Sequence, residues 1–242
     1  MIKLSLKNKK SLSIKLVSAA FLAFVVFVCS GFAQNVSKQT VITGDEMVVR
    51  KSGNVTVSKG NSKAVNGKNV ITSDTMIYNK KKSLLEAVGG VKLTSLVNDG
   101  EPLKAFGNFA EYNIDSEKGK LWGANTNVQY FVKDSTAPIV LKAGEIYFNG
   151  GLETLSAFKD VEIITSSGTI TGDKAVYDKK SESITVDKST AGAKRPAADV
   201  YYDGRKGFYQ ADQMVLYHST ESRRIIMTGN VTGTIEMEDK IK

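Results

Sequence analysis

The residues of this chain that could carry out chemistry are few, and they do not gather in the sequence. Cys29 is the only cysteine and His218 the only histidine among 242 residues, and His218 opens a predicted turn. A metal site needs several such ligands at defined spacings, and nucleophilic catalysis needs a nucleophile beside a base. We therefore predict no metal site, no cofactor and no catalytic centre, and we expect that the protein is not an enzyme.

An acidic or amide residue recurs at intervals along the chain and is the next candidate for chemistry. Asp74, Asn108 and Asp173 are the clearest examples. Calcium-binding β-rolls carry a tandem Gly-Gly-x-Gly-x-Asp motif with a period of about nine residues, which this chain lacks. We therefore interpret these side chains as stabilisers of turns.

Each of these residues belongs to a short phrase that occurs about six times after residue 40. The phrase consists of a small residue, an acid or amide, three mixed residues, an aromatic residue, and Asn or Asp. The clearest copies are Ser73–Asn79, Gly107–Asn113 and Gly172–Asp178, and looser copies have Asp45, Glu145 and Asp212 at the second position. Successive second positions are 29, 34, 37, 28 and 39 residues apart. Repetition on this scale predicts units that bury their apolar faces only by stacking on their neighbours.

The repeats predict β structure. Apolar residues alternate with polar ones, as in Met76 and Tyr78 or Val91 and Leu93, and no unit has a helical period. Turn-forming stretches follow at 79–83, 115–119 and 178–181. We therefore predict an all-β fold of repeated antiparallel hairpins.

The apolar stripes of these hairpins must face one another, in a roll of two facing sheets or in a closed barrel. Regular repetition favours the open-ended roll. The first strand, near 40–49, and the last, at 230–237, contain no proline. Exposed sheet edges invite pairing with another chain. Head-to-tail stacking of copies and edges blunted by loops or charges are the two alternatives.

The first 33 residues are expected to form a signal peptide. Basic residues precede an apolar run of 14 residues, Leu16–Cys29, and Gly31 and Ala33 are the small residues of a cleavage site. The run is shorter than the roughly 20 residues of a transmembrane helix. We expect cleavage after Ala33 and export of residues 34–242 as one domain. A retained membrane anchor at 16–29 is the alternative.

Removal of this leader leaves a nearly balanced charge. Five of the 33 Lys and Arg residues lie in 1–33, which contains no acidic residue, so the remaining 28 face 25 acidic residues, a net charge of +3. Nucleic-acid binding needs a concentrated basic surface. We therefore expect no nucleic-acid partner.

Residues 40–237 resemble the OstA-like (LptA) family. Gly53–Val57, Gly89–Leu93 and Gly229–Thr232 are similar to the Gly-Asn-Val strands of that family, and the Asp-x-x-x-Tyr-Asp phrase is the other half of its repeat. The resemblance implies a twisted β-jellyroll, open at both ends, in the periplasm. Its apolar groove would carry the lipid A acyl chains of lipopolysaccharide, or a related glycolipid, from the inner to the outer membrane. It also implies LptC-like and LptD-like β-jellyroll partners, or further copies of the chain, that pair through edge strands.

The lipid-binding lining is expected on the dry face of the strands. Each of these residues could equally be an ordinary core residue, and the outcome depends on whether the two sheets close or stay apart. An inner-membrane-anchored LptC-like relay and a structural β-repeat protein without a ligand remain alternative functions. The expected lining residues are Val55, Val57, Met76, Tyr78, Val91, Leu93, Tyr112, Val128, Tyr130, Val161, Ile163, Tyr177, Met214 and Leu216.

Three copies of the phrase depart from its spacing. The Asp45 copy has Val49 in the aromatic position, the Glu145 copy has its aromatics early, and the Asp212 copy has its aromatic late, at Tyr217. A shift of one residue exchanges the faces of a strand, so we predict β-bulges in these copies. The stretch 189–206 is expected to be a longer loop.

Overall fold

The structure is a computed structural model that describes residues 40–97, 101–131, 137–149, 153–188, 193–202, 204–218 and 224–236. The expected signal peptide, 1–33, and the alternative anchor, 16–29, lie outside these residues. None of the described residues belongs to a helix that is long and apolar enough to span a membrane. The fold described here is that of the unit Thr40–Lys242.

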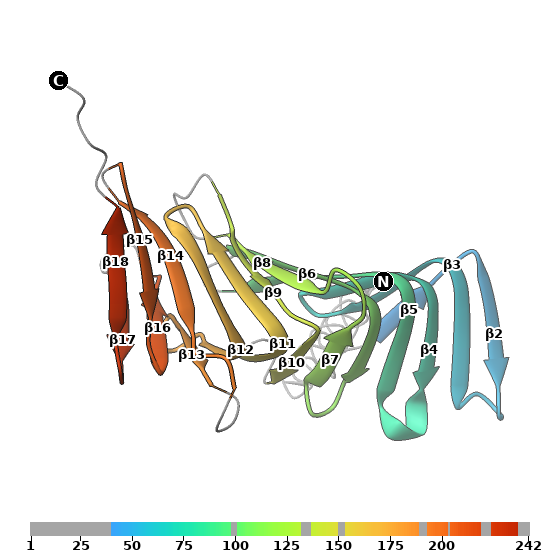
Figure 1. Ribbon diagram of the computed structural model, residues 1–242. Helices are drawn as coiled ribbons and strands as arrows, with labels where there is room; N and C mark the ends of the chain where they lie inside the picture. Colours follow the sequence, from blue (N-terminus) through green and yellow to red (C-terminus); the bar gives the residue numbers. More distant parts are fainter. Residues whose placement is uncertain are drawn as a thin grey trace, which may run out of the picture. The chain divides into compact units, whose positions relative to one another are not determined.

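The described chain is a succession of strands with one short 3-10 turn, η1 (Lys80–Lys82) (Figure 1). In chain order the strands are β1 (Thr40–Thr43), β2 (Glu46–Arg50), β3 (Val55–Asn66), β4 (Asn69–Asn79), β5 (Leu84–Val97), β6 (Glu101–Asn113), β7 (Lys118–Trp122), β8 (Asn127–Tyr130), β9 (Ile139–Lys142), β10 (Glu145–Asn149), β11 (Thr154–Thr165), β12 (Gly168–Asp178), β13 (Ser183–Asp187), β14 (Ala197–Tyr202), β15 (Arg205–Gln210), β16 (Gln213–Tyr217), β17 (Arg224–Thr228) and β18 (Thr232–Glu236).

The strands form one antiparallel hydrogen-bonded network that folds over into two layers. The long strands β3, β4, β5, β6, β11 and β12 belong to both layers. For example, the second half of β6 pairs with β7 and its first half pairs with β8. We name as layer A the strands β2, β7, β10, β13, β16 and β17 with the adjoining halves of the long strands. Layer B contains β1, β8, β9, β14, β15 and β18 with the other halves. The predicted all-β, open-ended roll of antiparallel hairpins is confirmed.

The corner between the layers explains the recurring acid or amide. Where β5 crosses from one layer to the other, Gly89 and Gly90 have φ angles of 80° and 52°. The side chain of Asp74, at the corner of β4, lies against them, and a Cβ atom on Gly89 would lie 2.2 Å from Asp74 Oδ2. At the corner before β2, Asn61 Nδ2 donates a hydrogen bond to Asp45 Oδ2 at 2.9 Å. These side chains thus pack against the corner of the next strand, and not within their own hairpin turn as expected.

The bulges lie at these corners and not in the three irregular copies, so that prediction was wrong. β2, β10 and β16 pair with their neighbours without a register shift. Gly144 N donates to Lys159 O at 2.8 Å, as Asp45 N does to Gly60 O at 2.9 Å. Gly144, and not Glu145, is therefore the corner residue of the fourth copy. Phe148 follows it by four positions, the spacing of Tyr78 after Asp74, so the copy is regular once it is aligned one residue earlier.

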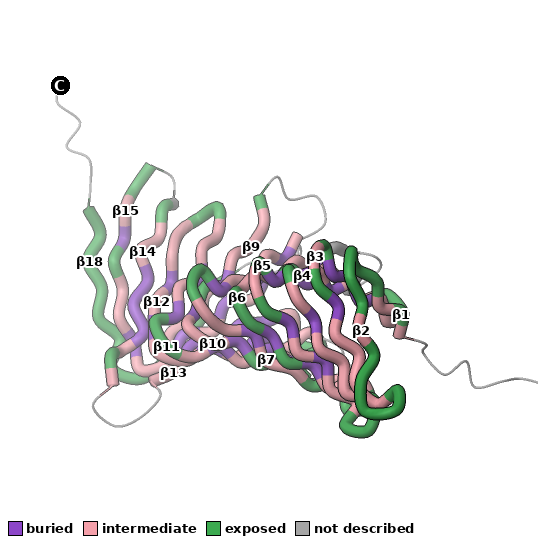
Figure 2. The backbone as a smooth tube through the Cα atoms, turned by 90° about the vertical axis from the view of Figure 1, so that its right-hand side faces the viewer, coloured by how far each residue is buried: buried purple, intermediate pink, exposed green. Residues whose placement is uncertain are grey.

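The core lies between the two layers, where buried positions alternate with more exposed ones along each strand (Figure 2). Cα partners on neighbouring strands point to the same face, so the registers define which residues are inward. Met76 and Tyr78 are inward, and their partners on β3 are Ser58 and Thr56. The largest fully buried side chains include Met76, Leu103, Leu121, Ile146, Ile163, Ile170 and Met214.

Two expectations about local structure need correction. Val57 pairs with Ile77, and Val55 pairs with Asn79, so both valines lie on the outer face of layer A and not in the lining. The expected loop 189–206 contains strand β14, which pairs with β12 and β15. Among the described residues of this stretch, only 193–196 and Gly204 lie outside strands. The short alternation of Ala198, Asp199 and Val200 was too brief to indicate a strand.

Candidate functional site

Both ends of the roll expose side chains that point inward. On β2, Met47 and Val49 are Cα partners of inward-facing Ser58 and Thr56, yet they are 46% and 59% exposed. On β18, Ile235 is the partner of Gly207 and is 59% exposed. No described strand covers these terminal strands, and β18 is exposed throughout (Figure 2). The apolar interior therefore reaches solvent at each end.

An apolar cavity of about 330 Å³ opens into the interior in the C-terminal third. Layer A contributes Leu216, Ile225 and Met227 to it, and layer B contributes Val200 and Tyr209. The full lining is Ala137, Pro138, Ile139, Thr165, Ser166, Ser167, Val200, Tyr201, Tyr209, Leu216, Tyr217, His218, Arg224, Ile225 and Met227. We name it the C-terminal cavity.

Small inward residues on layer B explain why the layers leave space here. Ala198 is the partner of Tyr209, and Gly207 is the partner of Val200. Gly207 and Gly233 flank the Tyr209 ring so closely that an added Cβ would lie 2.6 and 2.5 Å from it. The side chains that face β16 and β17 across the interior are therefore short, apart from Tyr209, and they do not fill the gap.

Three aromatic rings pack against one another beside the C-terminal cavity, and of these only His218 belongs to its lining. Ring centroids of Tyr130 and His218 are 5.2 Å apart, those of Tyr177 and His218 are 5.7 Å apart, and those of Tyr130 and Tyr177 are 6.0 Å apart. We name these residues the aromatic wall. His218 is only 4% exposed. It is therefore a buried residue that follows β16 and continues its inward face.

Behind the aromatic wall lies a second, much smaller cavity of about 20 Å³. It shares Ile139 and His218 with the C-terminal cavity. Its remaining lining is Leu103, Val128, Tyr130, Leu141, Leu155, Tyr177 and Ile184. His218 and Ile139 therefore adjoin both apolar spaces, whereas Tyr130 and Tyr177 face only the smaller one.

Arg224 is the one fully charged residue in the described lining of the C-terminal cavity. It begins β17 at the rim and is exposed, and its guanidinium carbon lies 4.7 Å from the centroid of the Tyr217 ring. Stacking on an aromatic face orients a guanidinium group and leaves its N–H donors available at the edge. The opening therefore combines an apolar interior with a cation at its entrance.

The interior of the N-terminal rungs is more polar. Ser62 Oγ donates to Ser58 Oγ at 3.0 Å, and Ser58 Oγ donates to the Thr43 carbonyl at 3.0 Å. Ser95 Oγ donates to Asn69 Oδ1 at 2.5 Å. These small, hydrogen-bonded side chains contrast with the aliphatic and aromatic lining of the C-terminal third.

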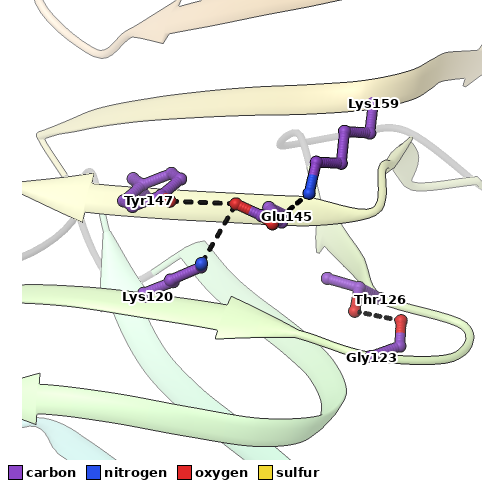
Figure 3. A network of polar contacts seen from close by, with 6 residues as sticks. All are labelled: Lys120, Gly123, Thr126, Glu145, Tyr147 and Lys159. Atoms are coloured by element: carbon purple, nitrogen blue, oxygen red, sulfur yellow. Dashed lines mark hydrogen bonds and ion pairs between the residues drawn. The ribbon is translucent and has the colours of Figure 1, made fainter.

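A charged network lies on the outer face of layer A, away from the interior (Figure 3). Glu145 receives a hydrogen bond from Tyr147 Oη at 2.9 Å and pairs with Lys120 at 3.0 Å and with Lys159. Lys159, then Lys120 and Tyr147, lower the pKa of Glu145 from its usual 4.5 to about 2. The hydrogen bonds to Tyr147 and Glu145 in turn raise the pKa of Lys120. This network joins β7, β10 and β11 and does not touch the C-terminal cavity.

Among the expected lining residues, all except Val55 and Val57 point into the interior. Leu216 reaches the C-terminal cavity, and Val128, Tyr130 and Tyr177 line the small one. The others lie in the interior outside both cavities: Met76, Tyr78, Val91, Leu93, Tyr112, Val161, Ile163 and Met214.

Sequence reasoning missed much of the lining. Ile225 and Met227 alternate with polar or exposed residues just as the selected pairs do, so the same pattern could have found them. Val200, Tyr209 and His218 lie outside the repeated phrase and gave no such indication. Among the described residues, no three His, Cys, Asp or Glu side chains come together in a way that could hold a metal ion.

Residues 41–150 match the family model described as "LptA/(LptD N-terminal domain) LPS transport protein". No curated protein matches the chain. Among solved structures, the chain is similar to LptH from Pseudomonas aeruginosa, described as the LptA homologous periplasmic component of the lipopolysaccharide transport device. The identity is 15%, the TM-score is 0.35, and the match covers 69% of this chain and 96% of LptH. Residues 41–150 are thus similar to the LptA/LptD N-terminal domain family of lipopolysaccharide-transport proteins.

Proposed function

We propose that the protein is a periplasmic lipid carrier that holds the hydrocarbon tails of lipopolysaccharide, or of a related glycolipid, between its two layers. The observation that carries this proposal is the C-terminal cavity, an apolar space of about 330 Å³ at an end of the roll that no described strand closes. Binding of this kind needs an apolar lining and an exit, and it needs no catalytic group.

Burial of apolar surface supplies the affinity. Each methylene moved from water into the cavity contributes about 0.8 kcal/mol, so a tail with ten buried methylenes gains on the order of 8 kcal/mol before the costs of association. The cavity volume lies near the lower end of the roughly 300–1,000 Å³ of ligand sites. It therefore takes part of a lipid with several tails, and the remaining tails extend along the open end or require the layers to part.

The terminal strands provide the route to the next carrier. β1 and β2 at one end, and β17 and β18 at the other, each have one edge without a described partner. Unpaired edges accept strands from another chain. LptC-like and LptD-like β-jellyroll partners, or another copy of this chain, would extend both layers and continue the interior from the inner towards the outer membrane.

Photo-crosslinking and mass spectrometry test the carrier function. A photoreactive residue at Met227, inside the C-terminal cavity, should give a lipid adduct in cells, and native mass spectrometry should detect co-purifying lipid. The same residue at Val57, on the outer face of layer A, is the control and should give none. If inward and outward positions react alike, or if neither reacts, lipid is not held between the layers and the structural β-repeat alternative is favoured.

The form of the N-terminus separates a free carrier from an anchored relay. We propose that residues 1–33 are removed and that the protein moves freely in the periplasm. N-terminal sequencing of the exported protein should begin at Gln34. A chain that retains residues 16–29 would instead be the inner-membrane-anchored relay.

A further inference from the structure

A row of aromatic side chains crosses the outer face of layer A in the middle of the roll. Phe109 of β6 is the Cα partner of Trp122 on β7. Trp122 and Phe158 of β11 are both partners of Glu145 on β10, and Tyr147 lies two residues further along β10. Phe109 and Tyr147 are each 40% exposed, and the other two rings are half-buried. We name Phe109, Trp122, Tyr147 and Phe158 the outer aromatic platform.

The rings of the platform are held in fixed orientations by one another and by a lysine. Those of Phe109 and Trp122 stack with their centroids 5.7 Å apart, and those of Tyr147 and Phe158 meet edge to face, also at 5.7 Å. Between the two pairs, Lys120 Nζ lies 5.1 Å from the ring centroids of both Trp122 and Tyr147. An exposed aromatic surface that is already ordered loses little conformational entropy when it binds a ligand.

Balanced charges lie beside the rings. Glu145 pairs with Lys120 and with Lys159, and it accepts a hydrogen bond from Tyr147 Oη (Figure 3). An open depression of about 850 Å³ adjoins this network, and its lining is Glu145, Tyr147, Phe158, Lys159, Asp160 and Asp173. Because carboxylates accompany the lysines, the site does not suit a polyanion, which binds to concentrated positive charge. It offers hydrogen-bond donors and acceptors to uncharged polar groups instead.

Two of the charged side chains at the depression are held at a strained corner. Lys159 and Asp160 have φ angles of 70° and 53°, in the left-handed region that disfavours L-residues. At the corresponding corner of β5, the same two positions are Gly89 and Gly90, with φ angles of 80° and 52°. The chain thus keeps two charged side chains where glycine would be unstrained, and both line the depression. Strain of this kind is typical of functional sites.

We propose that the outer aromatic platform and the adjoining depression bind an oligosaccharide whose pyranose units carry mainly equatorial hydroxyl groups. The C–H groups on the face of such a unit pack against the negative face of an aromatic ring, and the hydroxyl groups at its rim exchange hydrogen bonds with Lys159, Asp160 and Asp173. The platform crosses three strand spacings, about 14 Å, and so accommodates a short chain of units. This inference does not depend on the proposed carrier function, because the platform lies on the opposite face of layer A from the interior.

Trp122 provides a direct test, because it is the only tryptophan in the chain. The exported protein is titrated with two saccharides while tryptophan fluorescence is recorded, and isothermal titration calorimetry measures the same binding. One saccharide is the core oligosaccharide of lipopolysaccharide, freed of lipid A by mild acid. The other is cell-wall glycan freed of its peptides. We expect a saturable change in fluorescence and a matching heat with at least one of them. The saccharide that binds identifies the source, a glycolipid head group or the cell-wall polymer.

Variants at both ends of the platform make the result specific. Phe109→Leu and Phe158→Leu should each raise the dissociation constant by about three- to tenfold, because each removes one stacking surface. Phe208→Leu is the matched control, since Phe208 is also 40% exposed but lies on the outer face of layer B, and it should bind as the unaltered protein does. Lys159→Gly should weaken binding without loss of stability in urea, because glycine relieves the left-handed strain. Circular dichroism confirms that each variant is folded.

The outcomes bear on the platform alone. Neither heat nor a fluorescence change with either saccharide overturns the proposal, as does binding that Phe109→Leu and Phe158→Leu leave unchanged or that Phe208→Leu weakens equally. A photoreactive residue at Phe109 that captures a protein, in the absence of saccharide binding, assigns the surface to a protein partner and also overturns it. None of these results alters the carrier function, which the lipid adduct at Met227 tests separately.

Discussion

Replacement of Gly89 by Ala tests the corner geometry that produces two facing layers. Gly89 has a φ angle of 80°, in the left-handed region, where an L-residue is less stable by about 1–2 kcal/mol. An added Cβ would also lie 2.2 Å from Oδ2, 2.9 Å from Cγ and 3.0 Å from Cβ of Asp74, so the whole Asp74 side chain must move. Such overpacking costs about 1 kcal/mol or more. We expect Gly89→Ala to lower the free energy of unfolding by about 2–3 kcal/mol.

The fourth corner indicates how this loss should be reversed. There Lys159 occupies the left-handed position, with a φ angle of 70°, and the residue opposite is Gly144, not an acid. A Cβ on Gly144 would lie 3.0 Å from Lys159 Cβ. At each of these two corners, only one of the two facing residues carries a side chain: Asp74 faces Gly89, and Lys159 faces Gly144. Asp74→Gly in the Gly89→Ala background should therefore recover the steric part, about 1 kcal/mol, and leave the backbone strain.

Urea unfolding followed by circular dichroism measures these differences. Gly53→Ala is the matched control, since Gly53 has a similar φ angle of 87° but no atom within 4 Å of an added Cβ. The loss in free energy of unfolding of Gly53→Ala should therefore reflect backbone strain alone. If Gly89→Ala is no more destabilising than Gly53→Ala, or if Asp74→Gly gives no recovery, contact between Asp74 and the corner does not restrict the residue at position 89, and the explanation of the recurring acid is refuted.

Three further predictions follow from burial, charge and exposed edges. Ile163→Ala should lower the free energy of unfolding by about 2–5 kcal/mol and Val57→Ala by well under half of that, measured by urea unfolding; equal losses would contradict the assignment of faces. Because the pKa of Glu145 is lowered to about 2, its ionised form stabilises the fold above about pH 4.5, and this contribution is lost as the pH falls towards 2. The unaltered protein should therefore lose more stability between pH 6 and pH 3 than Glu145→Gln, and equal pH profiles would rule this out. Lysines at Ile226 and Ile235, both exposed on the terminal strands, should suppress concentration-dependent association in light scattering while thermal melting is retained; unchanged association would exclude pairing through this end.

The fold class could be predicted from the sequence because its cause is local. Alternation such as Met76 and Tyr78 depends only on the two-residue period of a strand, and the turns lie where Asn, Asp, Lys and Ser cluster. The inward direction of most selected residues followed from the same period. The interior between β3 and β17 therefore agrees with expectation at nearly every selected position.

Faces and registers were harder because they depend on a partner strand. Val55 and Val57 alternate with polar residues as regularly as the inward pairs do. In the register of β3 with β4, however, Thr56 and Ser58 are the partners of inward-facing Tyr78 and Met76, so the valines point outward. A strand with apolar residues on one face and small polar residues on the other does not by itself reveal which face is inward. Hydrogen bonds satisfy the buried hydroxyl groups of Ser58 and Ser62, so small polar residues are tolerated on the inward face of β3.

The cavity could not be predicted from the repeated phrase, because it depends on the volumes of the side chains that face one another across the interior. In the middle of the roll, Leu121 and Ile146 of layer A and Ile163 of layer B are fully buried, so the layers are packed together there. Towards β18, the inward positions Ala198 and Gly207 contribute almost no side chain. Strand pairing is equally regular in both regions. Capacity for a lipid is therefore a property of the inward side chains, and two chains with this fold could differ in it entirely.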